Sequence, residues 1–163
     1  MQWWKIRKHL EEIEMQNYPI NDDQYNLNRF VEAQAGIYNT ALSELKQGYK
    51  RSHWMWFIFP QLAIFGRSGT SKFYGITCKE EAALYLLHPL LGMRLRECAT
   101  TLLTLSGRTA HDIFGSPDDK KLKSCMTLFN YISDSDSVFE QVLDKYYQGK
   151  QCQRTIAYLN NKV

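Results

Sequence analysis

The chain has 163 residues, of which 44% are hydrophobic and 23% are charged, and these proportions are those of an ordinary globular protein. They exclude a disordered or fibrous chain, and a net charge of +3 is too small to indicate nucleic-acid binding by itself. The length suits one domain that buries roughly 70% of its unfolded surface.

The N-terminal segment is predicted to form an amphipathic helix over residues 3–16. Its apolar side chains recur at alternating spacings of three and four, which places on one helical face Trp3, Ile6, Leu10 and Ile13. We interpret this segment as an appended helix that docks on the domain or on a partner. It is also the segment through which the chain could form an oligomer.

A linker follows this helix. Pro19 and an Asn-Asp-Asp run fall within residues 18–26, and such residues interrupt regular structure. The sequence is therefore divided into an N-terminal helix with its linker, residues 1–24, and a helical domain, residues 25–163.

The domain begins with helices whose ends are marked by capping and helix-breaking residues. After a first helix that starts at Leu27, the helix of residues 38–45 is predicted to stop at Gly48. Ser52 is predicted to cap a short aromatic helix, residues 53–59, which the following proline ends.

The middle of the chain contains a predicted loop and two further helices. Three glycines between residues 66 and 75 mark the loop. Thr77 and Glu80 form a predicted capping box that opens a helix to about Leu87. The next helix has a buried apolar stripe over residues 91–105.

The last third of the chain carries the strongest start signals. Ser116 is a predicted capping residue, with Pro117 at the first helical position and two acidic residues after it. Ser137 and Glu140 form another capping box, and a final helix is expected over residues 152–159. Because no alternating strand pattern occurs, we predict an all-α fold, a compact multihelical single domain.

Cysteine usage indicates a reducing compartment. The four cysteines form no C-x-x-C pair, whereas zinc sites and secreted disulfide frameworks use tighter spacings. Cys98 and Cys125 fall on apolar stripes and are expected to be buried free thiols. No signal peptide is expected, and the longest apolar stretch, residues 54–65, is too short to span a bilayer. We therefore expect a cytoplasmic protein without a membrane partner.

The aromatic segment is the least typical part of the chain. His53, Trp54, Trp56 and Gln61 lie within nine residues. Indole N–H groups and imidazole nitrogens need partners when they are buried, so this cluster either satisfies itself inside the core or presents donors to a ligand. The structural alternative is the commoner one, because buried aromatic residues far outnumber binding sites.

The loop after the aromatic segment is a candidate anion site. Its glycines let backbone amides approach an anion, and side-chain donors are supplied by Arg67, Ser68, Ser71 and Tyr74. The pattern is not a P-loop, which needs G-x-x-x-x-G-K-[ST] after a strand. A plain solvated turn is an equally good interpretation.

Two hydroxyl residues further along the chain complete the candidate site. Ser124 and Thr127 stand beside large core residues on one predicted helix, where short hydroxyls often line a pocket. Asp119 with His53 is the acid/base combination worth testing. No histidine pair has metal-ligand spacing, so we expect no metal and no cofactor.

The sequence resembles a bacterial family, the domain-of-unknown-function family 1810, which sometimes carries the label calpastatin. The resemblance covers residues 25–159, and its motif of residues 53–62 is long and specific. The other matching stretches are residues 29–34, 41–48, 88–98, 113–115 and 121–129.

The resemblance implies a small multihelical single domain and names no reaction. The calpastatin label gains no support, since that inhibitor works as a disordered repeat and this chain has no repeats. Two departures from the family pattern are expected: residues 64–68 replace a turn richer in glycine, and Cys125 stands where a second serine is usual.

Two hypotheses of different classes follow. In the first, a pocket between the aromatic helix, the glycine loop and the Ser124 helix binds a nucleotide-like or ADP-ribose-like anionic ligand, with hydrolysis of that ligand left open. In the second, the chain is a non-enzymatic interaction module that binds a protein through residues 3–16. A nucleic-acid partner ranks third, because the net charge is modest.

Overall fold

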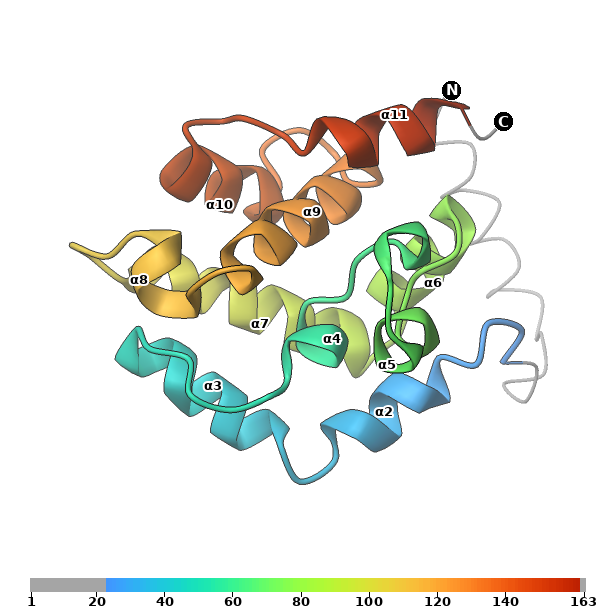
Figure 1. Ribbon diagram of the computed structural model, residues 1–163, viewed down its shortest axis with the longest axis horizontal. Coiled ribbons are helices and arrows are strands. Elements are labelled where there is room, and N and C mark those ends of the chain that lie inside the picture. The colour runs from blue at the N-terminus through green and yellow to red at the C-terminus, as the bar shows by residue number, and fades with distance from the viewer. Residues whose placement is uncertain (1–22, 162–163) are drawn as a thin grey trace.

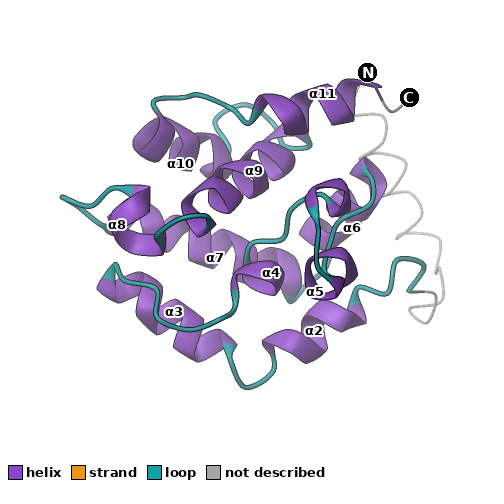
Figure 2. Cartoon of the chain, viewed as in Figure 1, coloured by secondary structure: helices purple, strands orange, loops and turns teal. Residues whose placement is uncertain are grey.

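A computed structural model describes residues 23–161, which form ten α-helices and one 3-10 helix (Figure 1). The predicted helix of residues 3–16 lies outside the described residues, as does most of the linker. Within residues 23–161 there is no strand (Figure 2). Extended backbone pairs there in one isolated parallel bridge, Leu62 with Ile76. The predicted all-α fold class is confirmed.

The first half of this region contains five short elements: α2 (Asn28–Gln34), α3 (Tyr38–Gln47), α4 (Met55–Ile58), the 3-10 helix η1 (Ala63–Phe65) and α5 (Gly69–Phe73). The second half contains six helices: α6 (Lys79–Leu87), α7 (Leu91–Thr104), α8 (Ala110–Phe114), α9 (Asp118–Tyr131), α10 (Val138–Tyr147) and α11 (Gln153–Asn161). The two longest are central, since α7 packs against α3, α6 and α10, while α9 packs against α6, α8, α10 and α11.

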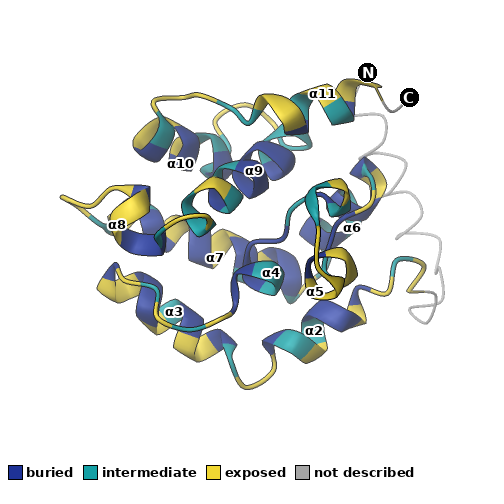
Figure 3. Cartoon of the chain, viewed as in Figure 1, coloured by how far each residue is buried: buried dark blue, intermediate teal, exposed yellow. Residues whose placement is uncertain are grey.

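The inward faces of α7 and α9 follow the apolar periodicity of the sequence (Figure 3). Cys98 on α7 and Cys125 on α9 are buried free thiols, as predicted. Burial raises the pKa of Cys98 to about 12 and the pKa of Cys125 well above its ordinary value, so both stay protonated. Their position in the core makes them packing residues.

Two helix ends form as the sequence predicts. The helix α3 ends at Gly48, which adopts a left-handed φ of 71°. At the start of α10, the Ser137 hydroxyl accepts a hydrogen bond from the Glu140 backbone N–H at 3.1 Å, while the Glu140 carboxylate accepts the N–H of Asp136, so half of the predicted capping box forms. Local sequence determines such ends, because the groups that satisfy them lie within one turn.

Three predicted caps are wrong by one or more residues. Ser52 does not cap α4, because its hydroxyl donates to Glu44 and the helix begins at Met55. Ser116 does not cap α9, since Pro117 stands at the N-cap position and no side chain caps that helix. The Thr77 hydroxyl and N–H both donate to Glu81 instead of forming a box with Glu80.

The predicted glycine loop contains a helix, α5. The Ser68 hydroxyl accepts the backbone N–H of Ser71, and the Ser71 hydroxyl accepts the N–H of Ser68, which makes a complete capping box. Gly69 occupies the first helical position, where its lack of a side chain does little harm. The three glycines thus flank and start a helical turn rather than exclude one.

A buried ion pair fixes the segment after α5. The guanidinium of Arg29 donates to the carbonyls of Phe73 (2.8 Å) and Gly75 (3.0 Å) and pairs with the Glu81 carboxylate at 2.8 Å. Both charged side chains are almost fully buried. Each charge is therefore stabilised by the other in place of water. Gly75 then passes so close to η1 that a β-carbon on it would lie 2.3 Å from the Cα of Ala63.

Gly75→Ala is expected to destabilise the protein by about 1–3 kcal/mol, because backbone must move to admit the methyl group. The matched control is Gly69→Ala, where a β-carbon meets nothing within 4 Å and a helix former replaces glycine. Urea unfolding of both variants measures the difference. Equal midpoints for the two variants would show that η1 and Gly75 are not held in contact.

Candidate functional site

The carboxylate of Glu44 positions the entry to α4. It is buried and accepts hydrogen bonds from the backbone N–H groups of Arg51 (2.5 Å) and Ser52 (2.8 Å), from the Ser52 hydroxyl (2.8 Å) and from the Trp54 indole N–H (3.2 Å). Burial raises the pKa of Glu44, but these hydrogen bonds outweigh burial and hold it below its ordinary value. Glu44 is therefore a charged acceptor at neutral pH.

The aromatic segment divides between core and surface. Trp54 has an exposed fraction of 0% and contacts the rings of Phe59 and Phe114. For Trp54 the structural interpretation holds, since its N–H is satisfied by Glu44 and no face is open to a ligand. Trp56 is half-buried and reaches the surface.

A chain of alternating charges connects this segment to the start of α9. The Lys50 ammonium lies 5.0 Å from the centre of the Trp54 ring and 2.9 Å from the carboxylate of Asp118. Asp118 also pairs with Lys121 at 3.2 Å. The Lys121 ammonium then lies 3.6 Å from the centre of the Trp56 ring, a close cation–π contact.

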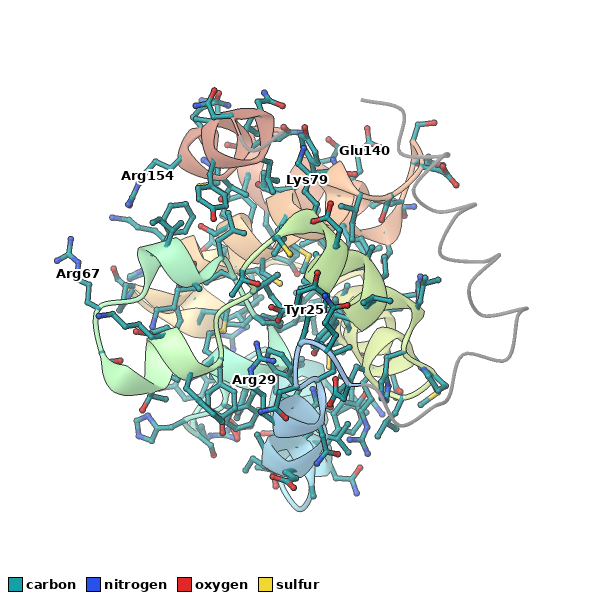
Figure 4. All side chains as sticks on the ribbon, turned by 90° about the vertical axis from the view of Figure 1, so that its right-hand side faces the viewer. Tyr25, Arg29, Arg67, Lys79, Glu140 and Arg154 are labelled. Atoms are coloured by element: carbon teal, nitrogen blue, oxygen red, sulfur yellow. The ribbon has the colours of Figure 1, made fainter. Side chains whose placement is uncertain are left out.

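A second cation–aromatic pair joins α11 to η1. The guanidinium of Arg154 lies over the ring of Phe65 at 4.5 Å from the ring centre. Phe65 is half-buried, whereas Arg154 is exposed. Arg67, in the turn after η1, is exposed as well, and Figure 4 shows Arg67 and Arg154 extending from the same side of the molecule.

We call these residues the candidate surface: Trp56, Phe65, Arg67, Lys121 and Arg154. They come from α4, η1 and its following turn, α9 and α11. The surface combines two aromatic rings with three cationic side chains, of which Lys121 is already paired with Asp118. Chemically, it offers ring stacking and attraction for an anion.

The other predicted loop residues have structural roles. Ser71 is buried, and its hydroxyl is used with that of Ser68 in the capping box of α5. The ring of Tyr74 packs against Phe57 at a centroid distance of 5.4 Å. Gln61 is half-buried beside η1, and its carbonyl accepts the Ile76 N–H at 2.9 Å.

Ser124 and Thr127 lie together, and both contact Cys152. The Ser124 hydroxyl lies 3.3 Å from the Lys120 carbonyl and 3.4 Å from the Cys152 sulfur. The Thr127 hydroxyl is fully buried, donates to the Lys123 carbonyl and accepts the backbone N–H of Cys152 at 2.9 Å. These hydroxyls therefore attach the start of α11 to α9.

The predicted acid/base pair takes a different form. The carboxylate of Asp119 lies 3.3 Å from Nδ1 of His111, whose side chain is 68% exposed. His53 is exposed, and it is not one of the residues that contact the Asp119 carboxylate. The pairing of Asp119 with His53 is replaced by one with His111, because α8 directly precedes α9.

Residues 23–161 contain neither a candidate metal site nor a candidate membrane span. In that region no group of three or more His, Cys, Asp or Glu side chains gathers to hold a metal ion. None of its helices has the length and apolar character to cross a bilayer.

The described residues form a small multihelical domain that carries two cation–aromatic pairs, Lys121 with Trp56 and Arg154 with Phe65. Residues 24–159 match the family described as "Protein of unknown function (DUF1810)", and the chain belongs to this family. The crystal structure of a conserved hypothetical protein from Mycobacterium tuberculosis is similar, with 48% sequence identity and a TM-score of 0.83. The match covers 85% of this chain and 99% of that chain. No curated protein matches the sequence.

Sequence reasoning missed three residues of this region, Lys121, Cys152 and Arg154. Lys121 had a usable signal, because it precedes Ser124 by three positions and so shares a helical face with it. Arg154 and Cys152 had no such signal. Their partners lie on η1 and α9, far away in sequence.

Thr127→Val is expected to destabilise the protein by about 1–3 kcal/mol, because the N–H of Cys152 loses its acceptor inside the structure. Thr101→Val is the matched control, since the Thr101 hydroxyl is also buried but donates only to the Glu97 carbonyl of its own helix. Denaturant unfolding compares them. A cost for Thr127→Val no greater than for Thr101→Val contradicts the proposed attachment of α11.

Glu44→Gln is expected to lower the stability at pH 7 by about 2–3 kcal/mol, because a charged acceptor of four hydrogen bonds becomes a neutral one. The folded pKa of Glu44 is below its ordinary value of 4.5. The stabilisation is therefore complete above that value and is lost as the pH falls through the folded pKa.

Unfolding of the wild type and of Glu44→Gln from pH 7 to pH 3 checks this expectation. The two stabilities should converge in acid. Glu32→Gln serves as control, since Glu32 is exposed, and should differ little from the wild type. A constant gap between wild type and Glu44→Gln across the whole range would contradict the role of the carboxylate.

Proposed function

We propose that the candidate surface binds a small anionic ligand that contains a flat ring, of the nucleotide or ADP-ribose class. The observation that carries the proposal is the contact of Lys121 with the half-buried ring of Trp56. This contact places the aromatic ring of Trp56 and the positive charge of Lys121 next to each other. A base linked to a phosphate requires both kinds of group.

The remaining cations support the same ligand class. Arg67 and Arg154 are both exposed, and a guanidinium can hold a phosphate with two parallel hydrogen bonds. Lys121 shares its charge with Asp118, so the two arginines supply most of the net positive charge. In this proposal the ring stacks on Trp56 and the phosphates lie toward Arg67 and Arg154.

Several predicted ligand contacts are left out of the proposal for physical reasons. Trp54, Ser71 and Thr127 are buried and already hydrogen-bonded within the protein. Gln61 stays in the proposal as a half-buried donor beside η1. No hydrolytic step is proposed, because His53 and Asp119 do not form the pair that such a step would use. The alternative of an interaction module depends on residues 3–16, outside the described region, and stays a prediction.

Thermal unfolding against mononucleotides, NAD, ADP-ribose and inorganic phosphate tests the proposal. A ligand at a hundred times its dissociation constant adds roughly 2.7 kcal/mol, which raises the Tm by about 5–10 °C for a chain of this size. Trp56→Ala and Arg67→Ala should each remove most of this shift. Arg108→Ala, which removes an exposed arginine near Gly48, should retain it.

A shift confined to one class of nucleotide and lost in the two site variants supports the proposal. A flat panel, or a shift that Trp56→Ala and Arg67→Ala both retain, contradicts it. A shift with phosphate alone would reduce the ligand to a simple anion and remove the role of the ring.

A further inference from the structure

Cys152 occupies a position that helices normally give to serine, threonine or aspartate. It directly precedes α11, and its carbonyl accepts the Ile156 N–H at 3.1 Å, the first hydrogen bond of that helix. It is therefore the N-cap residue, whose side chain faces unpaired backbone N–H groups. Unlike the buried Cys98 and Cys125, Cys152 is partly exposed.

The Ser124 hydroxyl lies 3.4 Å from the sulfur of Cys152. Thr155, through its hydroxyl and N–H, and the N–H of Arg154 are near enough to favour the charged form of the sulfur. Burial by itself raises the pKa of Cys152, but these donors outweigh burial and bring it below the ordinary value of 9.0. They favour the thiolate, which is the nucleophilic form of cysteine.

The Thr155 hydroxyl is also available to an additional acceptor. Thr155 is fully buried, and its hydroxyl has no hydrogen-bond partner among residues 23–161. A buried hydroxyl without a partner is unfavourable and rare in folded proteins. Since this hydroxyl is near enough to Cys152 to favour its charged form, it can donate to a thiolate or to an oxygen bound to the sulfur.

The charges around Cys152 also favour an anion. No Asp or Glu occurs in residues 120–131 of α9 or in residues 148–161, which contain α11. The charged residues of these two segments are all cationic: Lys120, Lys121, Lys123, Lys150 and Arg154. The acidic residues of α9, Asp118 and Asp119, stand at its first turn and are paired with Lys50, Lys121 and His111.

We propose that Cys152 is a reactive thiolate and a site of reversible oxidation by small hydroperoxides. The thiolate sulfur attacks one peroxide oxygen, an S–O bond forms and the O–O bond breaks. With hydrogen peroxide the products are cysteine sulfenic acid and hydroxide, which carries away the negative charge of the thiolate. The sulfur is oxidised by two electrons and the peroxide is reduced by two. The Thr155 hydroxyl donates to the new oxygen.

This inference shares Lys121 and Arg154 with the candidate surface, but it does not depend on the proposed ligand, because the reaction at the sulfur uses neither Trp56 nor Arg67. Cys78 provides an internal control in the same chain. It is also partly exposed and also precedes a helix, α6, but its side chain makes no cap hydrogen bond, and the Thr77 hydroxyl lies farther from its sulfur, at 3.8 Å. The two thiols thus differ in the donors that face them.

The test compares the two thiols in the full-length wild-type protein. Iodoacetamide alkylation is followed by mass spectrometry between pH 6 and pH 9, and hydrogen peroxide treatment is followed by trapping with dimedone. We expect Cys152 to be alkylated at pH 7 roughly tenfold faster than Cys78 and to carry the dimedone adduct. Equal alkylation rates, or an adduct absent from Cys152, would overturn the proposal.

Two variants test the donors. Thr155→Val, which keeps the shape of the side chain, and Ser124→Ala should each slow alkylation of Cys152 at pH 7 by roughly three- to tenfold and leave Cys78 unchanged. Thermal unfolding confirms that each variant is folded. If both folded variants react at the wild-type rate, the assignment of these hydroxyls to the thiolate is wrong. Trp56→Ala should keep the reaction, so this test and the ligand test fail separately.

Discussion

The buried carboxylate of Glu44 is the constraint on which the candidate surface depends. A charge inside a protein must be matched by donors, because desolvation alone would make it too costly. Glu44 finds them in the backbone of residues 51–52 and in the Trp54 indole. Once these bonds form, the chain can enter α4 in one direction only, with Trp54 inside and Trp56 two residues further on, at the surface.

The same constraint orders the charges around α9. Because residues 51–52 are bound to Glu44, Lys50 lies where it reaches Asp118 at the start of that helix. Asp118 in turn holds Lys121 against Trp56. A buried acid on α3 thereby determines which cation meets which ring on α4, although α3 contributes no residue to the candidate surface. The buried pair of Arg29 and Glu81 positions another segment, because Arg29 binds the carbonyls of Phe73 and Gly75 at the end of α5.

Local patterns predicted the elements well and their connections poorly. The stripes of α7 and α9, the end of α3 at Gly48 and the Ser137 cap all follow from residues within one or two turns. The errors occur where a polar side chain has two available partners. Ser52 looks like a cap, yet its hydroxyl donates to Glu44, eight residues earlier, which no periodicity reveals.

The same limit applies to the site. Arg67 was identified because a cation in a glycine-rich turn is conspicuous in the sequence and is exposed in the structure. Arg154 and Lys121 become candidate site residues only through their tertiary contacts with Phe65 and Trp56. Predicting these contacts requires knowing how α9 and α11 pack against α4 and η1, and local sequence patterns do not reveal that packing.

Serine and threonine hydroxyls show why residue type alone does not assign a function. Ser68 and Ser71 satisfy each other at the start of α5, while Ser124 and Thr127 satisfy Cys152 at the start of α11. The hydroxyls of Ser68, Ser71 and Thr127 accept backbone N–H groups that a helix start leaves unpaired, whereas the Ser124 hydroxyl lies against the sulfur. The two starts differ in what remains unsatisfied. The α5 box leaves no hydroxyl over, whereas the α11 start leaves the Thr155 hydroxyl without a partner beside a sulfur atom. The unused Thr155 hydroxyl near this sulfur is the feature on which the proposed oxidation of Cys152 rests.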